Sequence, residues 1–164
     1  MNRKGFLLAS ETLKIIIAVI CIGFLVYFLV HLYMTNVGAR ELGEAEASLK
    51  EGNGALLVII EGLGSGDVRE DYLIPNPAGW WLIGFVGDEV KPNLCAGGNC
   101  LCLCKKKLDR DLPWNKNRQA ATCDKTGVCG VVENLGNLEK IQIGKSGTHV
   151  DIRNDGGIIN INES

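Results

Sequence analysis

The chain has 164 residues and a formal net charge of −2 at pH 7, with 17 basic and 19 acidic residues spread along it. Such an even distribution lacks the basic surface that nucleic acids require, so we exclude nucleic acid as a partner. Glycine occurs 21 times and only 6% of the residues are aromatic. The part of the chain outside any membrane segment is therefore predicted to form one small, turn-rich domain that needs a constraint beyond its hydrophobic core.

A membrane-spanning helix is predicted close to the N-terminus. Residues 15–33 read IIIAVICIGFLVYFLVHLY, an almost uncharged stretch of about the length, roughly 20 residues, that crosses the hydrocarbon core of a bilayer. Basic residues precede it at Arg3, Lys4 and Lys14, whereas Arg40 beyond it is followed by glutamates. This charge bias places the N-terminus in the cytoplasm and the C-terminal domain in the extracellular space, with the lipid bilayer as a partner.

A cleaved secretory signal is the alternative to a permanent anchor. Val37 and Ala39 are small residues at the spacing that a signal peptidase prefers. The apolar stretch is, however, longer than the apolar core of an ordinary signal peptide. We therefore assign residues 1–36 to a basic N-terminus and a transmembrane helix.

The opening segment, MNRKGFLLASETLKIII, resembles the class III signal peptide of type IV pilin-like proteins, especially those of archaea. It has a short basic leader, Arg3-Lys4-Gly5, followed by an apolar helix with one early glutamate, Glu11. The resemblance implies that a prepilin peptidase cuts between Gly5 and Phe6. It also implies that the exposed helix packs into a homo-oligomer or filament. A plain single-pass anchor is the alternative interpretation.

A helical stalk is predicted to continue from the membrane over residues 37–66. Leucine recurs at every seventh position, which marks the seam of a helix, at Leu42, Leu49, Leu56 and Leu63. Glycines 52 and 54 weaken this prediction, because each costs about 1 kcal/mol relative to alanine in a helix interior. In the alternative, the helix breaks there and residues 55–60 form a strand. Residues 67–164 make up the extracytoplasmic, cysteine-rich β domain.

Several short strands are predicted in this last region. They are indicated by apolar or alternating runs, at residues 80–86, 99–105, 127–132, 140–143, 150–153 and 158–161. The sequence Asn154-Asp155-Gly156-Gly157 is typical of a hairpin turn. The predicted fold class is α+β: a long N-terminal transmembrane helix that continues as a stalk, and then a small antiparallel β domain held by disulfides. Type IV pilins are organised in a similar way.

Seven cysteines occur in the chain, six of them beyond the predicted membrane span. A metal site is one interpretation of Cys95, Cys100 and Cys102, whose spacing comes within one residue of a plant-type ferredoxin motif. Structural zinc sites favour cysteine pairs separated by two to four residues, and neither histidine of the chain lies near this segment. We predict that these cysteines hold no metal and that the chain binds no cofactor.

Disulfide bonds are the preferred interpretation of the same cysteines. In a strand over residues 99–105, Cys100, Cys102 and Cys104 share one face, so each needs a partner elsewhere. The remaining candidates are Cys95, Cys123 and Cys129, which complete an even set of six with 15 possible connectivities. We expect three bridges that link the cysteine-rich strand to the loops before and after it, each contributing about 2 to 4 kcal/mol to stability.

Two adjacent tryptophans, Trp80 and Trp81, are candidate interaction residues, because one of them must face outward in a strand. The alternative is that the rest of the domain covers both. The segments NPAGWW (residues 76–81) and NCLCLC (residues 99–104) are similar to motifs of uncharacterised single-pass membrane proteins of archaea. That resemblance implies the architecture and no activity.

The predicted function is that of a membrane-anchored extracytoplasmic structural or interaction protein at the cell surface, with a pilin-like filament subunit as its specific form. We expect no enzyme, because the sequence contains no nucleophile elbow, phosphate-binding loop or zincin helix. The alternative function is a membrane-tethered module that uses cysteine thiolates for metal binding or redox chemistry.

Overall fold

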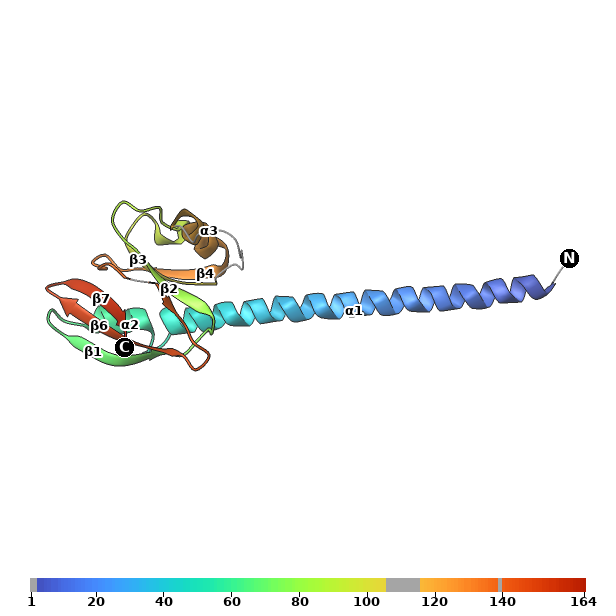
Figure 1. Ribbon diagram of the computed structural model, residues 1–164, viewed down its shortest axis with the longest axis horizontal. Helices are drawn as coiled ribbons and strands as arrows, with labels where there is room; N and C mark the ends of the chain where they lie inside the picture. Colours follow the sequence, from blue (N-terminus) through green and yellow to red (C-terminus); the bar gives the residue numbers. More distant parts are fainter. Residues whose placement is uncertain (1–2, 106–115, 139) are drawn as a thin grey trace. The chain divides into compact units, whose positions relative to one another are not determined.

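The computed structural model describes residues 3–105, 116–138 and 140–164, and the side chains from residue 12 onward. The chain divides into two compact units, one ending at Arg40 and the other running from Glu41 to Ser164. Helix α1 (Arg3–Leu49) makes up the described part of the first unit and contributes its last turns to the second. Figure 1 labels most of the elements, which together form an α+β fold.

The large apolar side chains of α1 between positions 13 and 34 are exposed. The large apolar residues among positions 13–34 keep between 43% and 68% of their surface exposed. One span of this helix, within Thr12–Leu49, is long and apolar enough to cross a membrane. Because so much exposed apolar surface is unfavourable in water, α1 is a candidate transmembrane helix that anchors the chain in a membrane.

The predicted continuous stalk is wrong between Leu49 and Leu56. Helix α1 ends at Leu49 and a second helix, α2 (Leu56–Gly62), follows after a turn in which Gly52 has a φ of +89°. Glycine adopts this left-handed conformation at little cost, which explains the break. The alternative is correct in placing a break at residues 52–54 and wrong in its strand over residues 55–60, because Leu56–Gly62 is helical. The predicted leucine seam is correct in part, since Leu49 and Leu56 are fully buried.

The second unit also contains two antiparallel sheets. The first has the order β1-β6-β7, and its strands are β1 (Val68–Ile74), β6 (Thr148–Asp155) and β7 (Ile158–Glu163). The second has the order β4-β3-β2-β5, and its strands are β2 (Trp80–Phe85), β3 (Cys100–Lys105), β4 (Gly127–Val131) and β5 (Ile141–Gln142). The predicted strands therefore all form, and β6 and β7 meet at the predicted hairpin turn.

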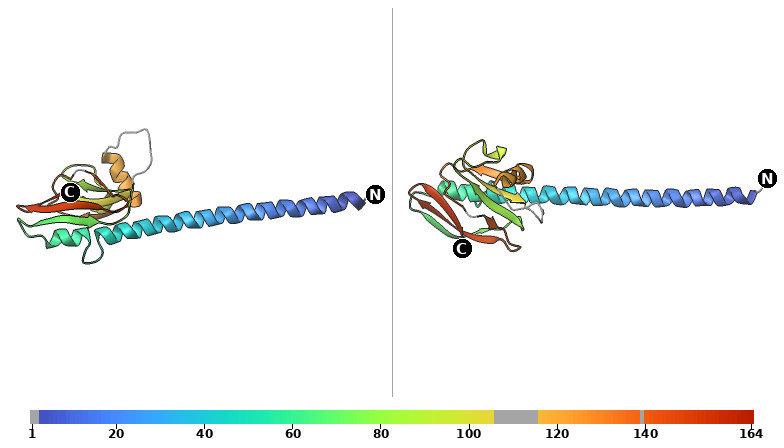
Figure 2. Two further views of the ribbon diagram at one scale, coloured as in Figure 1. Left: turned by 60° about the horizontal axis from the view of Figure 1, so that its bottom comes forward. Right: turned by 45° about the horizontal axis from the view of Figure 1, so that its top comes forward.

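The main hydrophobic core draws on both sheets, on the last turns of α1 and on α2. Leu101 and Leu103 of β3 are fully buried in it together with Val150 and Ile152 of β6. A second, smaller core lies on the opposite face of the four-stranded sheet and contains all six cysteines that follow the span. Helix α3 (Lys116–Thr126) and the short 3-10 helix η1 (Asn93–Cys95) pack there, and Figure 2 shows α3 beside β3 and β4.

Candidate functional site: a buried disulfide cluster

Strand β3 sorts its residues between the two cores by simple alternation. Leu101 and Leu103 point into the main core, whereas Cys100, Cys102 and Cys104 point into the second core. Successive side chains of a strand project to opposite faces, so the sequence CLCLC builds a leucine face and a cysteine face. The prediction that the three cysteines share one face is confirmed.

Three disulfides connect this cysteine face to its surroundings. Cys95 bonds Cys100, Cys102 bonds Cys129, and Cys104 bonds Cys123, with Cα–Cα distances of 5.7, 4.1 and 5.0 Å. The prediction of three bridges is confirmed, and each of them joins β3 to a segment before or after it. The two later partners lie in regular elements rather than loops, since Cys129 belongs to β4 and Cys123 to α3.

The register of the sheet fixes the central bridge. Cys102 and Cys129 are directly opposite each other on β3 and β4. Side chains in such cross-strand pairs lie close together.

Gly127 begins β4 where the chain leaves α3. A Cβ atom there would lie 2.7 Å from the carbonyl oxygen of Cys123 and 3.0 Å from Cys104 Sγ. Only glycine therefore lets the chain turn so close to the Cys104–Cys123 bridge.

Hydrogen bonds from η1 to α3 close the outer side of the cluster. The side-chain amide of Asn93 donates to one carboxylate oxygen of Asp124 at 3.0 Å, and the backbone N–H of Leu94 donates to the other at 3.4 Å. Asp124 is adjacent to Cys123, whereas Asn93 and Leu94 precede Cys95. These contacts hold the outer partners of two bridges next to each other.

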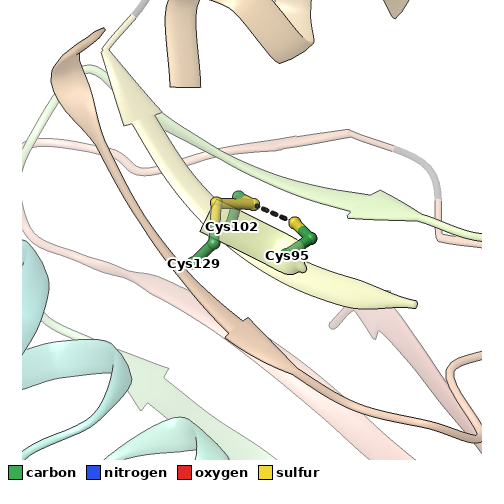
Figure 3. Close-up of side chains that lie close together, drawn as sticks. All are labelled: Cys95, Cys102 and Cys129. Carbon is green, nitrogen blue, oxygen red and sulfur yellow. Dashed lines mark hydrogen bonds between the residues drawn. A yellow bond between two sulfur atoms is a disulfide. The ribbon is translucent and has the colours of Figure 1, made fainter. Parts of the chain in front are cut away.

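Two of the bridges touch at Cys102, and the third lies close to it. Its Sγ atom lies 3.8 Å from Cys95 Sγ and 3.8 Å from Cys100 Sγ, and Figure 3 marks the first of these approaches with a dashed line. Both are non-bonded contacts of disulfide sulfurs, which carry no hydrogen to donate. The sulfurs also form two overlapping groups of three within 4.8 Å, namely Cys95, Cys102 and Cys129, and Cys102, Cys104 and Cys123.

Thiolates could bind a soft metal ion from these positions, but a sulfur in a disulfide is not a thiolate. All six sulfurs are bonded in pairs, so each group of three would need reduction before it acquired ligands. The residues are also closed to solvent: Cys129 has 3% of its surface exposed and the other five have none. Apolar side chains surround them, including Phe85, Ile83 and Ala120. This arrangement is suited to cross-linking the domain.

The two candidate interaction residues lie on opposite faces of β2. Trp80 is buried in the main core with 3% of its surface exposed, so it contacts no external partner in this state. Trp81 packs against the disulfide cluster and stays partly exposed, with Lys140 Nζ 5.7 Å from the centre of its ring. The expected split between faces is confirmed, and an interaction role remains a prediction for Trp81.

The residues of the expected processing site, Gly5, Phe6 and Glu11, all lie in α1, where the structure describes the backbone as helical. They are separate from the disulfide cluster in the sequence and belong to the first unit. Cys21 also lies in α1 and is a free thiol.

A polar cluster on the three-stranded sheet was not predicted. Asp71 lies at a bulge of β1 with a φ of +55°, and its carboxylate contacts His149 Nδ1 of β6 at 2.6 Å. Asp151 accepts hydrogen bonds from the backbone N–H of Asp71 and the hydroxyl of Ser164, which together hold the pKa of its carboxyl below the usual value. These residues are far apart in the sequence, so no local motif marks them.

Comparison with known proteins adds no relative. No family model, curated protein or solved structure matches the chain.

Proposed function

We propose that this protein is a membrane-anchored structural or interaction protein of the cell surface, with its disulfide-bonded domain outside the cytoplasm. The observation that carries the proposal is the pairing of all six cysteines beyond the span in one buried cluster. Disulfides persist in oxidising compartments and are rare in the reducing cytosol. The basic residues before the span support the same orientation, because such residues favour the cytoplasmic side.

Assembly into a pilin-like filament is the specific form of this proposal. The apolar side chains of α1 at positions 13–34 are exposed in the single chain, so the helix has the surface needed either to remain in lipid or to pack against copies of itself. The short basic leader ending at Gly5 supports processing before assembly, because it resembles a class III signal peptide. Removal of this leader would place Phe6 at the new N-terminus.

The orientation is tested by treating intact cells of the native host with a protease and probing for the domain of residues 67–164. The protease is expected to digest this domain in intact cells. An outer cell layer that excludes the protease would protect it. A matched sample of lysed cells controls for accessibility. Protection in intact cells with a permeable surface, followed by digestion after lysis, would contradict the proposed orientation.

The filament is tested by shearing cells and examining the released fraction by immunogold electron microscopy. A variant with Gly5→Leu is expected to keep its leader and to lose the filaments, because the residue at the cleavage site is no longer glycine. Gly43→Ala is the matched control, since a Cβ atom at Gly43 meets nothing within 4 Å. A membrane-bound protein with no labelled filaments in the wild type would leave the plain anchor as the function.

The overlapping groups of three sulfurs favour one alternative function, a thiolate metal-binding or redox module. That function requires the cysteines to be reduced in the native membrane. Elemental analysis of protein purified without reductant tests it. Iron, zinc or copper in a fixed ratio to the chain, together with free thiols at the six positions, would establish the alternative.

A further inference from the structure

Cys102 occupies the centre of the disulfide cluster. Both sulfurs of the Cys95–Cys100 bridge lie 3.8 Å from Cys102 Sγ, which is itself bonded to Cys129. Figure 3 shows the Cys95 sulfur directed at the Cys102–Cys129 bridge. We propose that Cys102 is an internal thiol–disulfide exchange site: when its bond to Cys129 opens, Cys102 takes Cys95 from Cys100. This inference goes beyond the structural role proposed above and does not depend on the orientation of the domain.

The proposed reaction begins at Cys129, which has the largest exposed fraction of the six bridged cysteines. Cys129 is 3% exposed, whereas the other five bridged cysteines are fully buried. An external thiolate, such as that of a small-molecule thiol, attacks Cys129 Sγ and forms a mixed disulfide with it. The Cys102–Cys129 bond breaks and Cys102 leaves as a thiolate. This thiolate is released in van der Waals contact with a second disulfide.

The second step moves the bridge without net oxidation or reduction. The Cys102 thiolate attacks Cys95 Sγ, the bond between Cys95 and Cys102 forms, and the Cys95–Cys100 bond breaks. Cys100 leaves with the electron pair and takes a proton from solvent. The side chain of Cys102, no longer held by Cys129, turns about its Cα–Cβ bond to approach along the sulfur–sulfur axis.

Strand geometry selects Cys95 as the target. Cys100 and Cys102 are two residues apart on β3, so their side chains stand side by side and are poorly placed to bond each other. Cys95 belongs to η1, a separate element whose sulfur reaches over β3. The product is therefore a domain with a Cys95–Cys102 bridge and with Cys100 no longer bridged. The attacking species is a thiolate, so the exchange becomes faster as the pH rises.

The first test is a pair of single variants of the full-length protein in detergent. Cys129→Ala leaves Cys102 without its partner, and alkylation followed by peptide mapping is expected to find the new free thiol mainly at Cys100. Cys100→Ala leaves Cys95 without its partner, and the new thiol is expected mainly at Cys129. Cys21 is already free and serves as the reference for labelling. The proposal would be overturned if Cys129→Ala were labelled at Cys102 at least as strongly as at Cys100. It would also be overturned if Cys100→Ala were labelled at Cys95 at least as strongly as at Cys129.

Cys123→Ala is the matched control. It leaves Cys104 without a partner on the same strand as Cys102. Attack on Cys102 would require a bond between residues two apart on one strand, and Cys129, the other sulfur of that bridge, lies outside the group of three sulfurs that contains Cys104. The new thiol is expected to remain at Cys104, with the other two native bridges intact. Migration of this thiol into the other bridges would overturn the role of strand geometry in the proposal.

A measurement on the unaltered chain covers the case in which a variant fails to fold. The wild-type protein is partially reduced with dithiothreitol, quenched in acid and mapped for its remaining bridges. Species with two bridges are expected to include the Cys95–Cys102 pair, and its share is expected to be larger at pH 8.5 than at pH 6.5. Native bridges alone, at both pH values, would overturn the proposal.

Discussion

Gly130 of β4 lies directly against Leu57 of α2, so close that a Cβ atom at position 130 would overlap Leu57 Cδ1. The neighbouring positions of α2, Leu56 and Ile60, are buried in the main core. Glycine at position 130 thus allows α2 to approach the four-stranded sheet. The disulfide cluster lies on the other face of the same sheet, so only the four-stranded sheet separates α2 from the disulfides.

This contact gives the first prediction. Gly130→Ala is expected to destabilise the second unit by about 1 to 3 kcal/mol, because the added methyl overpacks the contact between α2 and β4. Urea unfolding of the full-length protein in detergent, followed by tryptophan fluorescence, measures the change. Gly43→Ala is the control and is expected to stabilise α1 by up to about 1 kcal/mol, since alanine is the better helix former and meets no neighbour. Equal stability of Gly130→Ala and the wild type would contradict the prediction.

The second prediction concerns the turn between α1 and α2. The hydroxyl of Tyr72 in β1 donates a hydrogen bond to the backbone carbonyl of Gly54. Partial burial raises the pKa of Tyr72 above its usual value, although Arg69 opposes this effect. The neutral phenol is therefore favoured in the folded state. The neutral phenol contributes its full stabilisation at pH values below the pKa of Tyr72 in the unfolded chain, about 10. This stabilisation is lost as the pH rises through the higher pKa of Tyr72 in the folded state.

Tyr72→Phe is expected to lower stability at neutral pH by about 1 kcal/mol, the usual net value of one hydrogen bond. It is also expected to flatten the loss of stability above about pH 10. Unfolding experiments between pH 7 and 11 measure both effects, with Tyr33→Phe in the span as the control. If stability fell as steeply above about pH 10 in Tyr72→Phe as in the wild type, a group other than Tyr72 would be the cause of the loss.

The third prediction concerns the polar cluster of the three-stranded sheet. Hydrogen bonds from Asp71 and Ser164 lower the pKa of Asp151. The ionised carboxylate is therefore favoured by folding, and its contribution is present above the unfolded pKa of about 3.9 and lost as the pH falls through the lower folded pKa. Asp151→Asn is expected to flatten the acid limb of the stability profile, and Ser164→Ala is expected to flatten it less. An unchanged acid limb in both variants would contradict this assignment.

The fourth prediction ranks the three bridges. Replacing both cysteines of a bridge by alanine removes a constraint on the unfolded chain, and the loss grows with the length of the closed loop. The bridges span 27, 19 and 5 positions for Cys102–Cys129, Cys104–Cys123 and Cys95–Cys100. Destabilisations of roughly 3.5, 3 and 2 kcal/mol are expected in that order. Urea unfolding of the three double variants measures the order, and the largest loss from the Cys95–Cys100 variant would contradict the loop-entropy account.

The sequence predicted the cysteine face of β3 because a strand has a period of two residues, and CLCLC displays that period without ambiguity. It could not select the partners, because these depend on the register between β3 and β4 and on the position of α3. The register places Cys129 opposite Cys102, whereas α3 brings Cys123 to Cys104. Neither relationship has a local signature.

Strand β1 and helix α3 were missed for physical reasons. Strand β1 contains a bulge between Arg69 and Tyr72 and leaves most of its residues exposed, which hides the alternation that marks a strand. Helix α3 is short and polar, and its buried residues Ala120 and Cys123 make a weak apolar pattern. The end of α1 at Leu49 was misjudged because the leucine repeat continues across the break, whereas the turn at Gly52 interrupts the helix.

The most direct test of the central claim is the intact mass of the full-length protein purified from its native membrane, recorded under native and then under denaturing, non-reducing conditions. The account predicts a denatured mass that is six hydrogens below that of the fully reduced chain, with no additional mass from a metal in the native spectrum. Loss of residues 1–5 would add support for pilin-like processing. A mass that retains all thiols, or one increased by a metal that a chelator removes, would contradict the account and make residues 95–104 part of a reactive site.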